Sequence, residues 1–338
     1  MVMKLLTFRK RGERIARVGT LSSGREIVDL NAAYASYLLE KGEPEPTRTA
    51  DAHIPTDMTE FILGGKASSK AAEAALVYIE EKKSEGGPLL GPNSEQIVLP
   101  EEEIGFMPPL LHPTKMICAG MNYREHLADS GRSSPEMPVA FLKLPSAFVG
   151  HQGEIMFTKK TASLDYEIEL AVVIGKEGKY IKPEEALEFV YGYTIFNDVS
   201  ERDLQIFEMT HGMLLGGKNM DAFAPIGPWI VTRDEIEDPH NLQLTLKVNG
   251  EIRQSSNTKH MTFNILEQIA YWSNFMTLYP GDIFGTGTPS GVALGRKPNP
   301  GKYYLKPGDV VEAEIEGLGT LINRVVAEQS SVDLKDPG

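Results

Sequence analysis

Three carboxylates in the middle of the chain have the types and spacing of a metal site. Glu167 and Glu169 alternate with apolar residues in the strand-like run LDYEIELAVVIG, which places both on one strand face with Asp165. Asp198 ends the next apolar run, YGYTIFND. A solvated strand face is the common alternative for such a pair. Residues 171–174 are apolar on both faces, however, so the strand enters a core, where grouped carboxylates require a cation.

These carboxylates would offer oxygen ligands alone, and that ligand chemistry favours a hard divalent cation. We expect Mg²⁺ or Mn²⁺, with open positions left for water and substrate. The sequence has no cysteine cluster and no His-Glu-x-x-His motif, so zinc is not expected.

One histidine has the surroundings of an acid–base group. His126 lies in AGMNYREHLADSG, and on a helix it shares a face with Asp129 at i,i+3. A carboxylate that orients an imidazole and raises its basicity enables it to take a proton from water. A surface pair without function is the alternative on spacing alone. His211 and His260 have no comparable neighbour in the sequence and are predicted to be surface or loop residues.

Two glycine-bearing segments are further candidates for contact with a ligand. Lys218 follows paired glycines in LLGGKNMDAF, where the backbone can approach a ligand closely; a solvated loop lysine is the alternative. The segment DIFGTGTPSGV carries Gly287 and Thr288 but lacks the Gly-x-Gly-x-x-Gly spacing of a dinucleotide site. It predicts either a glycine-rich wall with threonine hydroxyls facing a ligand or a simple loop.

Composition excludes several classes of partner. The net charge of −13 argues against nucleic acid and against an anionic membrane surface, because both are bound through clustered Lys and Arg. No run approaches the ~20 apolar residues of a spanning helix. The single cysteine, Cys118, excludes an internal disulfide and reads as a buried small hydrophobe. Because the N-terminus also lacks a signal-peptide pattern, these features predict a cytoplasmic protein.

The chain is predicted to divide into a small α+β unit with its linker over residues 1–110, a catalytic domain over 111–330 and a tail over 331–338. In the first unit, strands are expected at 3–8, 14–20 and 25–29, and helices at 31–41, 57–64 and 67–84. The second unit is strand-rich, with helices expected at 183–190, 201–209 and 263–275. The fold class is therefore mixed α/β but mainly β, with the helices outside the sheets.

Several separate motifs resemble the fumarylacetoacetate hydrolase family in order and spacing. They are GMNYREH, FLK (141–143), LDYEIELAVVIGK, FNDVSERDLQ, GGKNMDAFAPIGPWIV, LKVNGEIRQ and GDIFGTGTPSGV. The resemblance covers about residues 112–328. It implies a β-sandwich roll for the catalytic domain, usually as a homodimer, with a smaller N-terminal domain in longer members.

The resemblance also assigns roles to individual positions. Glu167, Glu169 and Asp198 match the family's ligands for Mg²⁺, sometimes Mn²⁺ or Ca²⁺. His126 and Lys218 match its catalytic positions. The remaining matches, which contact substrate or shape its pocket, are Arg202, Gln205 and Thr288, with Gly287 in the same loop. Asp129 departs from the pattern, because many smaller members carry a Glu three residues after the His.

Lys143 and Arg202 indicate an anionic ligand, although either could instead form an ion pair behind the site. The family's substrates are mostly small anionic 2-oxo acids. We therefore expect a metal-dependent hydrolase that cleaves a carbon–carbon bond in a 2,4-dioxo acid of the acylpyruvate or fumarylpyruvate type, with water activated by His126 and Asp129. The alternatives are an oxaloacetate decarboxylase, an isomerase or diketo-sugar-acid enzyme with the same metal site, and a metal-binding protein without activity.

Overall fold

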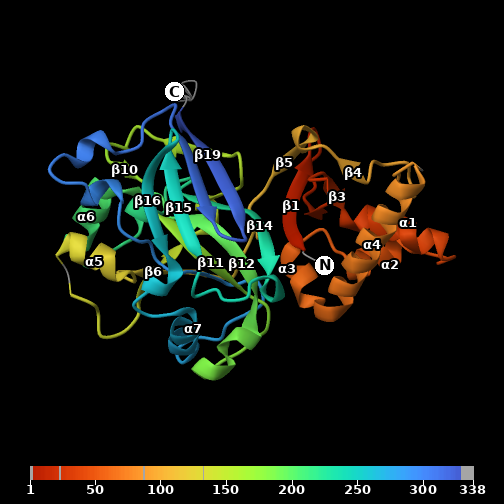
Figure 1. Ribbon diagram of the computed structural model, residues 1–338, viewed down its shortest axis with the longest axis horizontal. Coiled ribbons are helices and arrows are strands. Elements are labelled where there is room, and N and C mark those ends of the chain that lie inside the picture. The colour runs from red at the N-terminus through yellow and green to blue at the C-terminus, as the bar shows by residue number, and fades with distance from the viewer. Residues whose placement is uncertain (1–2, 23, 87, 132, 329–338) are drawn as a thin grey trace, which may run out of the picture.

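Two sheets form the frame of the protein, as the computed structural model shows (Figure 1). The structure describes residues 3–22, 24–86, 88–131 and 133–328, without the side chains of Asp129 and Ser130. The predicted tail at 331–338 lies outside these residues. A mixed, sheet-rich fold is confirmed.

The elements before residue 110 make the smaller lobe, at the right of Figure 1. Its strands are β1 (Lys4–Lys10), β2 (Arg17–Leu21), β3 (Ile27–Asp29), β4 (Val98–Leu99) and β5 (Ile104–Phe106). Its α-helices are α1 (Leu30–Glu40), α2 (Pro46–His53), α3 (Met58–Leu63) and α4 (Gly65–Glu85). Of these helices, α2 was not expected, because it buries only Ala50 and so has no apolar periodicity to detect.

The larger lobe contains the remaining elements. Its strands are β6 (Met116–Gly120), β7 (Val139–Lys143), β8 (Phe148–Val149), β9 (Glu154–Phe157), β10 (Leu164–Asp165), β11 (Ile168–Ile174), β12 (Val190–Asn197), β13 (Ser200–Glu201), β14 (Ala224–Thr232), β15 (Gln243–Val248), β16 (Glu251–Asn257), β17 (Ile283–Gly285), β18 (Val310–Ile315) and β19 (Gly319–Ala327). Its α-helices are α5 (Arg124–Ser130), α6 (Arg202–Thr210) and α7 (Ile265–Ser273). The helix expected at 183–190 is instead the 3₁₀ helix η3 (Pro183–Phe189).

The larger sheet runs in the order β4-β3-β2-β1-β14-β12-β11-β17-β6-β7, and the second sheet runs β16-β15-β18-β19-β9. Contacts of β14 with β19, of β12 with β18 and of β11 with β15 pack the two sheets against each other. Strand β11 therefore lies in the middle of the larger sheet and beneath the second one. All seven of its residues are buried, which is why both of its faces had to be apolar or tightly compensated.

The two lobes share the larger sheet. Strand β1 pairs antiparallel with β14, with Lys4 opposite Val231 and Leu5 opposite Ile230. The domain boundary near residue 110 remains a prediction. Within the described residues, no helix is both long and apolar enough to cross a membrane.

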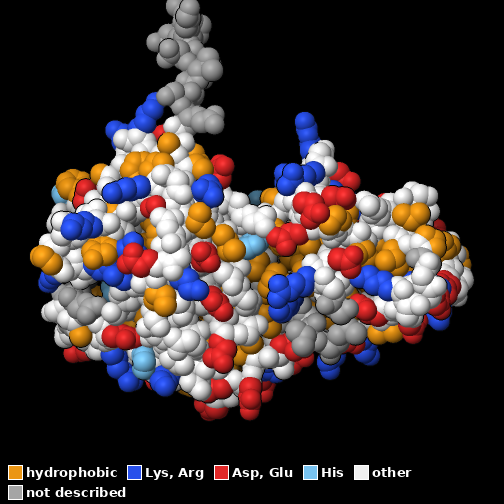
Figure 2. Space-filling model, turned by 45° about the horizontal axis from the view of Figure 1, so that its top comes forward, with side chains coloured by type: hydrophobic (Ala, Val, Ile, Leu, Met, Phe, Trp, Pro, Cys, Tyr) orange, Lys and Arg blue, Asp and Glu red, His pale blue; other side chains and the backbone are white. Residues whose placement is uncertain are grey.

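A cavity of about 830 Å³ lies between the lobes, and Figure 2 shows the surface notch there. His151 lines it and is 9% exposed. Its Nδ1 accepts a hydrogen bond from the Ile322 amide at 3.1 Å, and its ring meets Phe106 edge-on at 4.8 Å. Burial lowers the pKa of His151 from 6.5 to about 4.

This pKa predicts acid sensitivity. Between pH 6.5 and 4 the unfolded chain binds a proton at His151 that the folded chain does not, so stability falls as pH falls through that window. We expect a loss of about 2 to 3 kcal/mol in the free energy of unfolding, at about 1.4 kcal/mol per pKa unit. His151→Gln keeps an acceptor for Ile322 but cannot be protonated, so the variant should lose less stability on acidification. Urea unfolding at pH 7, 5.5 and 4.5 measures this, with the exposed His211→Gln as control. Equal pH dependence in wild type and His151→Gln would contradict the prediction.

Candidate metal centre

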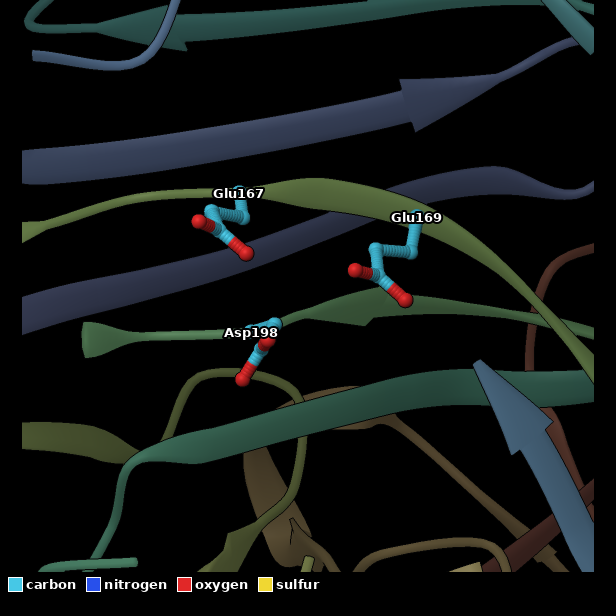
Figure 3. A group of neighbouring side chains, drawn as sticks. All are labelled: Glu167, Glu169 and Asp198. Atoms are coloured by element: carbon cyan, nitrogen blue, oxygen red, sulfur yellow. The ribbon is translucent and has the colours of Figure 1, made fainter. Parts of the chain in front are cut away.

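The three predicted carboxylates meet in one buried cluster. Glu167, Glu169 and Asp198 are 6%, 1% and 0% exposed, and one oxygen of each lies within 4.8 Å of the others. Figure 3 shows Glu167 and Glu169 on one chain segment, with their side chains directed toward the neighbouring segment that carries Asp198. The pairing of β11 with β12 sets this arrangement, because Ile168 lies opposite Asn197 and the Asp198 amide donates to the Glu167 carbonyl at 2.8 Å.

Asp165 does not join the cluster, although strand alternation placed it on the same face. The strand is interrupted after Asp165, between β10 and β11, and the alternation does not continue across the break. The Asp165 carboxylate instead accepts from Arg202 Nε at 2.8 Å and from the amides of Ala293 and Leu294 at 2.8 and 3.0 Å. It is a compensated buried charge that holds Arg202.

Lys218 forms ion pairs with two of the carboxylates at once. Its Nζ lies 2.9 Å from Glu167 Oε2 and 2.5 Å from Asp198 Oδ2. Burial disfavours its charged form, but the attraction of Asp198 and Glu167 outweighs burial and raises the pKa of Lys218. The residue therefore acts in this site as a fixed positive charge and not as a base.

The glycines before Lys218 have a different purpose from the predicted one. A Cβ on Gly217 would lie 2.6 Å from the Gln205 amide nitrogen, so this glycine allows the loop to pack against α6. The Glu208 carboxylate accepts from the amides of Gly216 and Gly217 at 2.6 and 3.1 Å. The close approach is thus to a helix, and it fixes the backbone that presents Lys218.

Lys143 and Arg202 form ion pairs in this structure, which is the second alternative that the sequence allowed. The Lys143 ammonium lies 2.9 Å from Asp198 Oδ1 and donates to the carbonyls of Val199 and Phe223 at 3.0 and 2.7 Å, and to that of Lys218. Arg202 Nη2 lies 2.5 Å from Glu167 Oε1. Both cations therefore hold the site's acids in place.

Gln205 and Thr288 are placed through their neighbours. Arg202 Nη1 donates to Gln205 Oε1 at 2.8 Å. The Thr288 hydroxyl donates to the Ile168 carbonyl at 2.9 Å and accepts from Gln254 Nε2 at 2.9 Å. Thr288 therefore fixes the backbone between the two glutamates. Because its hydroxyl hydrogen is already donated to Ile168, the hydroxyl could only accept a hydrogen bond from a ligand.

Glu169 is the least compensated of the cluster's acids. Among the described residues, its side chain has one hydrogen bond, from the Gly287 amide at 3.0 Å. Gly287 adopts φ +92°, and a Cβ on Gly285 would lie 2.6 Å from Glu169 Oε2, so the glycine-rich loop is shaped to this carboxylate. Burial and repulsion from Asp198 and Glu167 raise the pKa of Glu169 well above its usual range.

The residues present fit a divalent cation. Four buried carboxylates, those of Asp165 and the three clustered acids, face only three buried basic side chains, those described above. The negative charge without a partner lies at Glu169. All three clustered residues offer carboxylate oxygens, the ligands that Mg²⁺ and Mn²⁺ prefer. Glu167, Glu169 and Asp198 would hold the ion.

His126 lies at the edge of this cluster, on α5. It is half-buried, and against the opposing effect of burial the pKa of Glu167 is lowered by Lys218, by Arg202 and by the protonated form of His126. The proposed partner Asp129 belongs to the same helix, but its side chain lies outside the described part of the chain. The pairing of His126 with Asp129 therefore remains a prediction.

Two residues next to His126 in the sequence were not singled out by the pattern analysis. Asn122 Nδ2 donates to the carbonyls of Thr286 and Phe263 at 2.7 and 3.0 Å, so it joins the glycine-rich loop to the start of α5. Tyr123 is fully buried, and within the described residues its hydroxyl has no hydrogen-bond partner. The signal was available in the motif GMNYREH, where both precede the histidine.

The chain is similar to known proteins over most of its length. A family model described as "Fumarylacetoacetate (FAA) hydrolase C-terminal" matches residues 115–326. The bovine protein "Oxaloacetate tautomerase FAHD2A, mitochondrial" is 41% identical over 304 residues, covering 90% of this chain and 85% of that protein.

Solved structures show the same fold. The fumarylacetoacetate hydrolase of Exiguobacterium antarcticum is 33% identical, with a TM-score of 0.71 over 96% of this chain and all of that one. Maleylpyruvate hydrolase from Sphingobium sp. SYK-6, in complex with manganese(II) ion and pyruvate, is 28% identical, with a TM-score of 0.68 over 97% and 100%.

The predicted cytoplasmic location is wrong. The bovine relative is a mitochondrial protein, as its name states. The prediction failed because a single unpaired cysteine is compatible with any compartment that keeps thiols reduced, and it therefore does not distinguish among them.

The charge deficit at Glu169 predicts how metal binding responds to mutation. Glu169→Gln removes one ligand charge and should weaken Mn²⁺ binding by at least about 10-fold, while Glu188→Gln, on the exposed face of η3, should leave it unchanged. Titration followed by the EPR signal of free Mn²⁺ measures both affinities. Because a bound ion stabilises only the folded state, Mn²⁺ should also raise the melting temperature of wild type more than that of Glu169→Gln. Equal Mn²⁺ affinities in the three proteins would rule out this site.

Proposed function

The chain belongs to the fumarylacetoacetate hydrolase family, and we propose that it is a divalent-metal-dependent enzyme that interconverts the keto and enol forms of oxaloacetate or a closely similar 2-oxo acid. The observation that carries this proposal is the buried cluster of Glu167, Glu169 and Asp198, whose charge lacks one cation. Glu167, Glu169 and Asp198 would hold the ion, and a 2-oxo acid presents a carboxylate and a carbonyl oxygen side by side, which are the oxygen donors that a hard divalent cation prefers.

A bound divalent cation supplies Lewis acidity, which stabilises the negative charge that develops on the 2-oxo oxygen during enolisation. The rest of the chemistry belongs to the chain. Lys218 remains protonated and adds a fixed positive charge beside Glu167 and Asp198. A buried site of this kind also excludes bulk water from the reacting carbons.

His126 is the residue that we propose moves the proton. In the keto-to-enol direction its imidazole takes a proton from C3, the C3 electron pair forms the C2–C3 double bond, the carbonyl π electrons move to the 2-oxo oxygen, and the resulting imidazolium delivers its proton to that oxygen. In the reverse direction His126 returns the proton to C3. No carbon–carbon bond breaks and no water is consumed, so the reaction needs one acid–base residue and no positioned nucleophile.

The similarity to a bovine oxaloacetate tautomerase over most of both chains supports this reaction. The chain would take the same small dicarboxylate, and because the net charge of the chain is −13, the divalent cation would be needed to attract an anion to the site.

Hydrolysis of a 2,4-dioxo acid is the second candidate. It is favoured by the likeness to a maleylpyruvate hydrolase solved with manganese and pyruvate. Here His126, oriented by Asp129, would deprotonate water for attack on the distal carbonyl, and the pyruvate enolate would leave. Asp129 is one methylene shorter than the Glu expected at that position, which reduces its reach toward such a water. Decarboxylation of oxaloacetate is a further variant that uses the same enolate.

A panel of substrates tests these candidates. With Mg²⁺ or Mn²⁺, we expect accelerated loss of the enol absorbance of oxaloacetate without pyruvate release, and EDTA should abolish the acceleration. His126→Asn should reduce the rate by about 100-fold or more, as expected when an acid–base group is lost. Pyruvate formed from an acylpyruvate faster than oxaloacetate is tautomerised would favour the hydrolase. Pyruvate and CO₂ from oxaloacetate would favour the decarboxylase.

We also propose that the protein is a homodimer. Strand β7 ends the larger sheet, and an exposed edge strand generally needs cover. Exposed apolar side chains lie on β7 and just after it, on α6, and on the loop that follows α6. Asn219 connects this loop to β7, because its side chain hydrogen-bonds to the backbone of Leu142, Leu144 and Leu215. The exposed apolar side chains are Leu142, Leu144, Ile206, Phe207, Met213 and Leu215. An apolar surface of this kind around an edge strand fits a second copy of the chain.

Light scattering tests the dimer. We expect a mass near twice 37.2 kDa for the wild type, and a shift toward the monomer for Phe207→Asp, because a charge would then be buried in the contact. Tyr180→Asp, an equally exposed aromatic site outside this surface, is the control. A wild type that remains monomeric at tens of micromolar would overturn the proposal.

A further inference from the structure

The helix that carries His126 is fastened to the second sheet by three polar side chains. Ser256 Oγ donates to Glu125 Oε1, and His260 Nδ1 lies 3.1 Å from Ser256 Oγ and 3.2 Å from Glu125 Oε1. The three atoms are thus mutually within hydrogen-bonding reach. We call Glu125, Ser256 and His260 the α5 anchor.

Strand alternation explains why Ser256 is available for this contact. In β16, Gln254 and Ser256 are buried at 1% and 7% exposure, whereas Ser255 between them faces solvent. The 3₁₀ turn Thr258–His260 follows directly and brings His260 back over Ser256. The anchor therefore joins residues about 130 positions apart, and it gives His260, a partly exposed turn residue as the sequence predicted, partners that no neighbouring residue indicated.

Strand β16 contacts the metal centre as well as α5. Gln254 Oε1 accepts from the Ile168 amide at 3.0 Å, between the two glutamates, and its Nε2 donates to Thr288. Two residues further along the same strand, Ser256 holds Glu125. One short segment thus sets both the carboxylate side of the site and the helix that faces it.

The geometry of α5 connects the α5 anchor to the direction of the His126 side chain. Successive residues on an α-helix point about 100° apart, so Glu125 can face β16 while His126 faces the carboxylates. The chain before α5 is already tied, because the Thr262 and Phe263 amides donate to Asn122 at 2.7 and 2.8 Å. The anchor adds a contact in the first turn of α5, and that contact fixes the rotation of the helix about its entry point.

We propose that Glu125, Ser256 and His260 are positioning residues that set the direction of His126 toward the substrate. The proposal rests on the role of His126 proposed above. Glu125 and His260 alone are too exposed for a firm ion pair, with side chains 37% and 42% accessible. The buried Ser256 hydroxyl supplies the fixed point that gives the cluster a single geometry.

Hydrogen–deuterium exchange tests the anchor without using activity. Ser256→Ala and Glu125→Gln should raise the exchange rate of the amides in a peptide covering α5 by several-fold, with peptides of β11 and β12 unchanged. The matched control is Ser255→Ala, the neighbouring outward serine on the same strand. Mn²⁺ affinity should be unchanged in all three variants, since the ligands remain. Unchanged exchange in α5, or an equal effect of Ser255→Ala, would overturn the proposal.

A double-mutant cycle tests whether the anchor acts through His126. Ser256→Ala should lower kcat by about 10- to 100-fold with little change in KM, as expected when a reacting group is misplaced. In the His126→Asn background the same substitution should cost less than about 2-fold, because there is no imidazole left to aim. If the fold-losses of kcat in the two single variants multiply in the double variant, the two residues act independently, and the positioning role is overturned.

The two proposals fail in distinguishable ways. A wild type that does not turn over oxaloacetate defeats the proposed function, but the exchange comparison still decides whether the anchor orders α5. An active wild type with unchanged α5 exchange in Ser256→Ala defeats the anchor and leaves the proposed function intact.

Discussion

The burial of grouped negative charge is the constraint on which the rest of the structure depends. Glu169 lies on β11, a strand that is covered on both faces; Glu167 directly precedes this strand, and Asp198 directly follows β12 beside it. Removing several carboxylates from water costs free energy unless cations and backbone amides surround them. The surrounding elements answer this demand one by one: Lys143 comes from β7, Arg202 from α6, Lys218 from the 3₁₀ turn η4 (Gly216–Lys218), and an amide from the glycine-rich loop.

This compensation explains features that would otherwise appear as unrelated loop chemistry. Gly217 is small so that the Lys218 loop can pack on α6, and Gly285 is small so that Glu169 fits beneath it. Thr288 and Gln254 carry no charge, but their side chains hydrogen-bond to the backbone of Ile168 between the two glutamates. What remains uncompensated is concentrated at Glu169, and a site with one local deficit binds one cation in one place.

Local pattern predicted the parts of the site that local geometry controls. The period of two in a strand placed Glu167 and Glu169 together, and the end of the next strand placed Asp198. The same rule failed at Asp165, because the strand breaks there and no residue type announces the break. The pairing of Glu125 with His260 lay beyond any local rule, since it depends on how the turn after β16 packs against α5. The sequence did not predict helix α2 for a different reason: this helix has almost no buried face, so its sequence lacks an apolar period.

The division of labour in the site bears on how one family fold can serve several reactions. Under the proposed function, the carboxylates, the cation they would hold and Lys218 would stabilise an enolate, and an enolate is common to tautomerisation, decarboxylation and hydrolysis. That half of the site cannot select among them. Selection would then come from the groups that face the carbon beyond the 2-oxo group, and His126 on α5 is the residue proposed for that place. A helix of seven residues has little intrinsic stability, so its direction is set by what it contacts. Contacts such as the α5 anchor, which touch no substrate, can therefore decide which of the three reactions the shared enolate undergoes.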